Sequence, residues 1–365
     1  MLTTGPAYDI IYLFLSEGQQ NERKENRDKP KGDYLIMAKK FYLVLDCETA
    51  TLPFANEIAQ GDADRKKKIA IARPLIYDIG WTICDRKGEI YDKKQFLIAE
   101  TFAVPSVFNT AYYAEKRPIY LEMLQRGEIT IKPWQEVVEI LIKDMNKVDS
   151  VGAFNSMFDF KKAIPFTDLY VSKLYSHDYF QWETIQRSIC KSIVTEKPRK
   201  NEEKEFEADS FKFHGVEYNL FDLWGLSVEY LLNNVSYKKE CLNHGLLTNS
   251  GLYFKSSAES TYQYLCDKYD FVEAHTALDD ATIETFILSR IAARGSVKPG
   301  IKFFPFRDLG YTDEFCLRNK KVNKNECFVV YAKISDYLED KENETSTYIT
   351  MMFNKLHALA AAMGI

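Results

Sequence analysis

The 365-residue chain lacks the marks of several broad protein classes. It has no surplus of positive charge, because 48 lysine and arginine residues stand against 53 aspartate and glutamate residues and give a net charge of −5. The longest apolar run near its start, DIIYLFL, is too short to span a membrane and lacks the flanks of a signal peptide. A basic balance would have indicated nucleic acid, but its absence does not exclude one, since enzymes that gather carboxylates around metal ions carry local negative charge.

The chain also lacks paired cysteines, internal repeats and a Walker A motif. Without a C-x-x-C pair or regular spacing, its cysteines are expected to be reduced thiols of a cytoplasmic protein. Its composition, 46% hydrophobic and 14% aromatic, is typical of a globular protein with a sizeable core. The seven cysteines are Cys47, Cys84, Cys190, Cys241, Cys266, Cys316 and Cys327.

Changes in composition divide the chain into three parts. Residues 1–36 are charged and aperiodic, and we interpret them either as a disordered arm or as translated upstream sequence, with Met37 as the natural start. Residues 37–294 contain regular strand and helix patterns, interrupted at about 160–219 by an insertion with a dense charge run. Residues 295–365 are a C-terminal extension of unknown role, with an expected strand at CFVVYAKI and a terminal helix.

Hydrophobic periodicity in the middle part predicts an α/β fold with a mixed sheet. Residues 41–49 form an apolar strand that we expect to be covered on both faces. The helix at 256–269 is predicted to open with a capping box of Ser256 and Glu259. Further strands are expected at 74–85, 90–100 and 149–155, helices at 134–145, from near Phe158 and at 280–293, and a small hairpin at 210–219.

Two acids end the first predicted strand. Asp46 and Glu48 are two residues apart, so their side chains leave the same face of the strand. Carboxylates forced together on a buried strand repel each other, and a hard divalent ion such as Mg²⁺ or Mn²⁺ relieves that repulsion. The alternative is that the strand ends here and both acids point to solvent.

Acids and one histidine also occur at the starts of two helices. Asp159 is expected in the first turn of the helix after the fourth strand, where an acid also complements the helix dipole. In HTALDD, Thr276 and Asp279 fit a cap and its third helical position, which leaves His275 on the preceding turn. Periodicity alone does not choose between Asp279 and Asp280 as the functional acid, and a single loop histidine is often incidental.

Taken together, four carboxylates and one histidine at the ends of elements suit two-metal phosphodiester hydrolysis. LDCET, NSMFD and HTALDD, in this order, resemble the three exonuclease motifs of the DEDDh branch of the DnaQ-like 3′–5′ exonucleases. The resemblance covers about residues 38–294 and implies a ribonuclease H-like fold with a five-stranded mixed sheet.

The resemblance also implies the roles of individual residues. The residues that match the metal ligands are Asp46, Glu48, Asp159 and Asp280, and His275 matches the general base. The implied cofactors are two Mg²⁺ or Mn²⁺ ions, and the implied substrate is a single-stranded 3′ end, with DNA slightly favoured, which is degraded to nucleoside 5′-monophosphates. Because no polymerase motif is present, a proofreading or repair role would need a polymerase or another replication or repair protein as partner.

Two departures from the family pattern affect the expected substrate. DCETATL stands where many members read D-x-E-T-T-G, and 115 residues separate Asp159 from His275. Aromatic residues at 173–185 and in FKFHGVEY could stack on bases, although we favour a core role for most of them. Asp222 is a weaker candidate that we interpret as structural. The alternatives are an exoribonuclease that trims short RNA and a catalytically idle nucleic-acid-binding protein.

Overall fold

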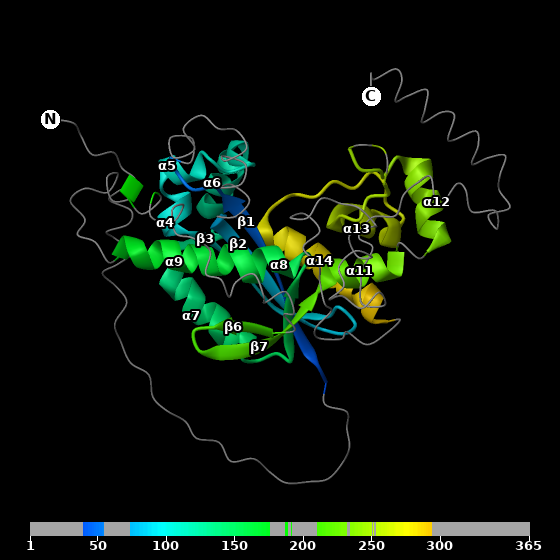
Figure 1. The fold of residues 1–365 in the computed structure, drawn as a ribbon, viewed down its shortest axis with the longest axis horizontal. Coiled ribbons are helices and arrows are strands. Elements are labelled where there is room, and N and C mark those ends of the chain that lie inside the picture. Colours follow the sequence, from blue (N-terminus) through cyan, green and yellow to red (C-terminus); the bar gives the residue numbers. More distant parts are fainter. Residues whose placement is uncertain are drawn as a thin grey trace, which may run out of the picture.

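The computed structural model describes residues 39–54, 74–175, 187–188, 191, 210–231, 234–249, 251 and 253–293. These residues form an α/β unit in which a mixed seven-stranded sheet is flanked by helices (Figure 1). The predicted α/β class is confirmed. The segment before Met37, most of residues 176–209 and the C-terminal extension lie outside the described residues.

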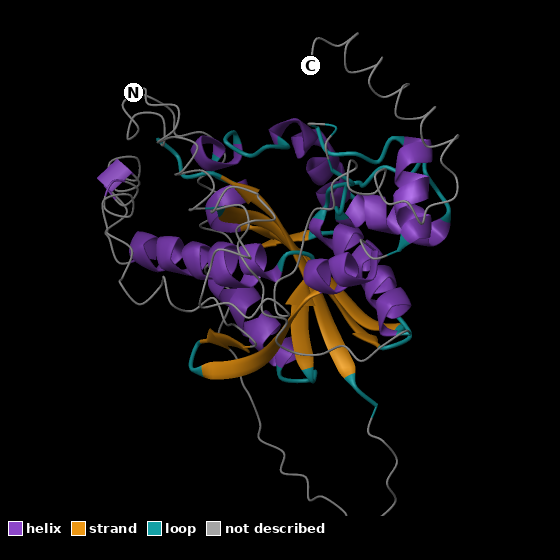
Figure 2. Cartoon of the chain, turned by 45° about the vertical axis from the view of Figure 1, so that its right-hand side comes forward, coloured by secondary structure: helices purple, strands orange, loops and turns teal. Residues whose placement is uncertain are grey.

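The sheet has the strand order β4-β3-β2-β1-β5-β7-β6. β1, β2 and β3 form an antiparallel meander, and β5 and β7 then continue the sheet parallel to β1. The strands lie together at the centre of the fold, with helices on either side (Figure 2). β4 pairs with β3 in parallel and β6 pairs with β7 in an antiparallel hairpin. The bounds are β1 Phe41–Ala50, β2 Leu75–Asp85, β3 Ile90–Ile98, β4 Thr130–Lys132, β5 Ser150–Ala153, β6 Ser210–Phe213 and β7 Val216–Asp222.

The predicted count of five strands is wrong, because short strands extend the sheet at both edges. β4 has three residues, too few for a clear alternation in the sequence, whereas the four-residue β6 is the first strand of the predicted hairpin. The predicted hairpin at 210–219 does form, but its second strand also pairs with β5 and so belongs to the main sheet. The aromatic side chains of FKFHGVEY lie mainly in the core, as expected: Phe211, Phe213 and Tyr218 are buried.

Helices cover both faces of the sheet. α7 and α9 lie against one face and α11, α13 and α14 against the other (Figure 1). The predicted helix at 134–145 is confirmed at both ends. The bounds are α4 Ala99–Phe102, α5 Pro105–Phe108, α6 Arg117–Gln125, α7 Trp134–Met145, α8 Ser156–Phe158, α9 Ile164–Tyr175, α11 Leu223–Leu231, α12 Val235–His244, α13 Ala258–Cys266 and α14 Ala277–Ala292, with a 3-10 turn at Ala114–Lys116 and a π-helical turn at Asp159–Ala163.

The start of α13 differs from the prediction by one residue. Ser257, rather than Ser256, is the N-cap, and its hydroxyl accepts a hydrogen bond from the backbone N–H of Ser260 at 3.2 Å. The Ser256 hydroxyl instead accepts a bond from the indole N–H of Trp224 at 3.1 Å. Ser256 has the spacing to Glu259 that a capping box requires, but Ser257 takes the cap and Ser256 bonds to Trp224, so the predicted capping box does not form.

Side chains of β1 alternate between the two faces of the sheet. Val44 packs in a cluster with residues of α11 and α14, whereas Leu45 belongs to the larger core on the opposite face. Asp46 and Glu48 continue the row of Val44, because residues two apart on a strand share a face. The strand is thus covered on both sides, as predicted, and its two acids project toward the α14 face.

The start of α14 lies very close to β2. A Cβ atom added at Gly80 would stand 2.4 Å from the backbone nitrogen of Leu278 and 2.6 Å from the carbonyl carbon of Ala277. Only a residue without a side chain permits this approach. Gly80 therefore fixes how closely the first turn of α14 sits over the centre of the sheet.

Within the described ranges, no helix combines the length and apolar character that crossing a membrane requires.

Candidate metal centre and hydrolytic site

The candidate residues come from three separate parts of the fold. Asp46 and Glu48 lie in the second half of β1, Asp159 opens the π-helical turn that follows β5 and α8, and His275 and Asp280 flank the start of α14. β1 and β5 are parallel neighbours, so the segment after β5 begins at the same end of the strands as Asp46. The order of the strands therefore brings acids that are distant in the sequence to one end of the sheet.

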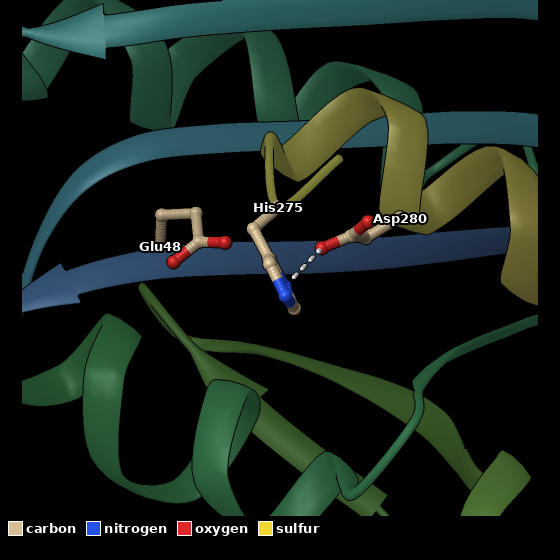
Figure 3. Close-up of side chains that lie close together, drawn as sticks. All are labelled: Glu48, His275 and Asp280. Carbon is tan, nitrogen blue, oxygen red and sulfur yellow. Dashed lines mark ion pairs between the residues drawn. The ribbon is translucent and has the colours of Figure 1, made fainter. Parts of the chain in front are cut away.

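Three of the predicted residues form a tight group. One ligand atom each from Glu48, His275 and Asp280 lies within 4.8 Å of the other two (Figure 3). The Nδ1 atom of His275 is 3.8 Å from a carboxylate oxygen of Asp280. The group has the donor set of a divalent-cation site, two carboxylates and an imidazole.

Asp46 and Asp159 lie beside this group rather than within it. Burial, followed by the charges of Glu284 and Asp159, raises the pKa of Asp46 well above its usual value. Burial also raises the pKa of Asp159, although hydrogen bonds from Cys47 partly oppose the shift. The charges of Asp159, Asp280 and Glu48 all act on Asp46, so the four predicted acids influence one another electrostatically.

Burial and repulsion from neighbouring acids make Glu48 and Asp280 difficult to ionise. Burial and the charge of Asp280 raise the pKa of Glu48 to about 9, while Lys116 acts in the opposite direction. Burial and the charge of neighbouring Asp279 raise the pKa of Asp280 to about 7, again against Lys116. Acids that resist ionisation in this way are stabilised as carboxylates once a cation binds among them.

Unpartnered oxygen atoms provide a second indication of a cation site. One carboxylate oxygen each of Asp159 and Asp280 is fully buried and has no hydrogen-bond partner. The two residues are only 2% and 8% exposed. A buried acceptor without a partner carries a desolvation cost of about 1–3 kcal/mol or more. A hard divalent ion satisfies such oxygens, so the residues present fit Mg²⁺ or Mn²⁺.

The two adjacent aspartates of α14 have different surroundings. Asp280 is buried and directed toward the group, whereas Asp279 is exposed and accepts a hydrogen bond from the Thr276 hydroxyl at 2.7 Å. α14 begins at Ala277, directly after Thr276, so the predicted helix start is confirmed. His275 lies on the preceding turn, also as predicted, with a left-handed φ of 52°.

The predicted cap of α14 needs a correction. The Thr276 hydroxyl makes no bond to a backbone N–H of the helix. The Ala277 N–H donates instead to Asp78 of β2 at 3.0 Å, and this carboxylate also accepts bonds from Gln95 and from the Tyr120 hydroxyl. A carboxylate brought by the sheet thus replaces the local cap. Asp78 could have been identified in the sequence, because it is an acid inside an otherwise apolar strand.

Two further acids adjoin the site and were missed in the sequence. Glu284 lies one turn after Asp280, is 2% exposed, and accepts the Phe154 N–H at 3.1 Å. Glu273 lies two residues before His275, with an oxygen 3.8 Å from its Nδ1 atom and the other oxygen buried without a partner. The i, i+4 spacing from Asp280 could have singled out Glu284, whereas the loop position of Glu273 gives no comparable signal.

Asp222 has the surroundings of a structural residue. It ends β7 and accepts backbone N–H groups from Asn155 and Ser156, at 3.1 and 3.0 Å, and from Gly225. Asn155 has a left-handed φ of 78°, and the chain turns there toward α8 and Asp159. Asp222 therefore holds the turn that delivers Asp159, in line with the structural interpretation.

Comparisons with known proteins add no relative: no family model, no curated protein and no solved structure matches the chain.

Proposed function

We propose that this protein is a metal-dependent 3′–5′ exonuclease that hydrolyses single-stranded nucleic acid and releases nucleoside 5′-monophosphates. One observation carries the proposal: acids from β1 and α14 meet beside a histidine, Asp159 of the turn after β5 adjoins them, and buried carboxylate oxygens of Asp159 and Asp280 lack partners. The proposal includes a ribonuclease H-like fold, with which the order of antiparallel β1-β2-β3 followed by parallel β5 and β7 is compatible.

In this proposal Asp46, Glu48, Asp159 and Asp280 hold two Mg²⁺ or Mn²⁺ ions. When bound, such ions hold the scissile phosphate and lower the pKa of water. His275 takes a proton from the attacking water at a ring nitrogen. Burial and nearby Lys116 lower the pKa of His275, which favours the neutral imidazole that a general base requires.

The test uses 5′-labelled single-stranded DNA and RNA of matched sequence, incubated with the purified full chain and Mg²⁺, Mn²⁺ or EDTA. A 3′–5′ exonuclease converts the labelled strand into a ladder that shortens one nucleotide at a time. Asp46→Ala and His275→Ala should abolish the ladder, and the exposed Asp279→Ala should leave it intact.

The outcomes separate the proposal from its alternatives. Cleavage that persists in EDTA, or that Asp46→Ala does not affect, contradicts the metal-dependent mechanism. Cleavage of RNA alone identifies an exoribonuclease. If both strands stay intact with each metal while the protein still binds them, the catalytically idle binding protein is the better description.

A further inference from the structure

A segment between α5 and α6 lies directly against His275. The ring of Tyr113 stacks on the imidazole, with the ring centroids 4.4 Å apart and the planes inclined by 17°. Three residues later, the Lys116 ammonium lies 4.5 Å from the centroid of the Tyr113 ring and donates a hydrogen bond to the carbonyl of Ala274. The segment therefore contacts both the side chain of His275 and the backbone next to it.

Two carboxylates lie near the polar edge of the imidazole. Its Nδ1 atom is 3.8 Å from a carboxylate oxygen of Glu273 and 3.8 Å from one of Asp280. At this distance neither carboxylate makes a hydrogen bond to the ring, so they do not define the plane in which it lies. The face-to-face contact with Tyr113 supplies that missing constraint.

We propose that Tyr113 is a positioning residue that fixes the plane of the His275 imidazole, and that Lys116 anchors Tyr113 for this purpose. The inference rests on the proposed function, in which His275 is the general base. A base must hold its ring nitrogen within hydrogen-bond reach of the attacking water. Without the stack, the imidazole of a partly exposed loop residue samples other rotamers and spends less time in that pose.

Tyr112 provides a matched control on the neighbouring position. Its side chain is 84% exposed and meets the Tyr113 ring edge-on, with the ring centroids 4.8 Å apart. Tyr112→Leu therefore removes an aromatic ring of the same size from the same segment and leaves the stack on His275 in place.

The first measurement follows the His275 ring by NMR in the full chain without added metal, and so does not depend on activity. The chain has five histidines, and His275→Gln identifies the His275 resonances by their loss. The Tyr113 ring current should displace these resonances in the parent protein. Tyr113→Leu should move them toward the chemical shifts of an unstacked imidazole, whereas Tyr113→Phe and Tyr112→Leu should leave them unchanged.

Two controls test whether the variants fold. Unchanged His214 and His244 resonances confirm an intact fold, and Tyr113→Met is the second variant if Tyr113→Leu does not fold.

The second measurement separates kcat from KM with the 5′-labelled strand. Tyr113→Leu should lower kcat about tenfold to a hundredfold, because small misplacements of a reacting group cost rate, with KM unchanged. Tyr113→Phe should restore kcat. A simple loss of folding would instead reduce the active fraction of both variants in proportion to their stability.

Two results overturn the inference: His275 resonances that stay in place in Tyr113→Leu, or resonances that move without a fall in kcat. If the parent protein cleaves neither strand, the proposed function has failed. The NMR measurement then decides by itself whether Tyr113 orients His275, since displaced resonances support that role and unchanged ones exclude it.

Discussion

At the scale of single residues, Asp279 and Asp280 show how burial gives two identical side chains different roles. Asp280 is 8% exposed, carries a buried oxygen without a partner and lies 3.8 Å from His275. Asp279 is exposed and bonded to the Thr276 hydroxyl. The two positions therefore form a natural pair of test and control.

Asp280→Asn should weaken Mn²⁺ binding by at least about tenfold, because it replaces an anionic donor by a neutral amide in a buried site. Asp279→Asn should bind Mn²⁺ as the parent does. Isothermal titration calorimetry on the two variants measures the difference, and equal affinities for both would contradict the assignment of Asp280 as a ligand.

His275 has two possible roles in the tight group, base or ligand, and one substitution distinguishes them. His275→Gln removes the base, so kcat should fall by about 10²–10⁴-fold while the affinity for Mn²⁺ is kept. Calorimetry and single-turnover kinetics on the same preparation give both quantities. A parallel loss of Mn²⁺ affinity would show that the imidazole binds metal.

At the scale of elements, the position of α14 governs the site, because its first turn carries Asp280 and follows His275. Two features of β2 set that position: the absence of a side chain at Gly80 and the carboxylate of Asp78 on the Ala277 N–H. Because the sheet holds the first turn of α14, Asp280 stays opposite β1. A small displacement of this turn should affect metal binding more than overall folding.

Gly80→Ala should push the start of α14 away from the sheet. The new methyl group would meet backbone atoms, so we expect a loss of about 1–3 kcal/mol in the free energy of unfolding together with weaker Mn²⁺ binding. Chemical denaturation and calorimetry measure the two effects.

Gly88→Ala is the matched control for this change. Gly88 has a φ of 80° and faces the Ser289 side chain, near the other end of α14. Its substitution should reduce stability through backbone strain and leave Mn²⁺ binding unchanged. Equal effects of the two variants on Mn²⁺ binding would argue against control of the site by the first turn of α14.

At the scale of the whole molecule, the buried acids tie stability to pH. The pKa of Glu48 rises from 4.5 to about 9, that of Glu273 from 4.5 to about 8, and that of Asp280 from 3.8 to about 7, with burial as the largest cause in each case. At a pH between the ordinary pKa and the raised pKa of each acid, the folded protein keeps a proton that the unfolded chain has lost. Stability without a divalent ion is therefore highest below this window and falls as the pH rises through it.

The melting temperature of the EDTA-treated protein should accordingly fall between about pH 5 and about pH 9. Added Mn²⁺ should raise it more at the alkaline end, because ligands bind metal only after losing their protons. Circular dichroism melts across this range measure the melting temperature. Glu48→Gln should reduce its dependence on pH, and Glu115→Gln, at an exposed position, should leave that dependence unchanged. A melting temperature that rises with pH without metal would contradict the prediction.

Much of the fold could be predicted because local periodicity reflects burial. The apolar run of β1, the helical spacing of α7 and the cap position before α14 are properties of neighbouring residues, and the structure agrees with each. The same local logic misplaced the cap of α13 and missed the three-residue edge strand β4. Patterns of three or four residues are too brief to distinguish strands from turns.

The sequence by itself determined which residue types stand at the ends of the main elements, since spacing and periodicity are local. The tertiary structure decided which of them meet. It added Asp78, Glu273 and Glu284 to the site, placed Tyr113 on His275, and joined the 210–219 hairpin to the sheet through β5. These are contacts between residues far apart in the chain or on loops without periodicity. They depend on how closely whole elements pack, which spacing along the sequence does not encode.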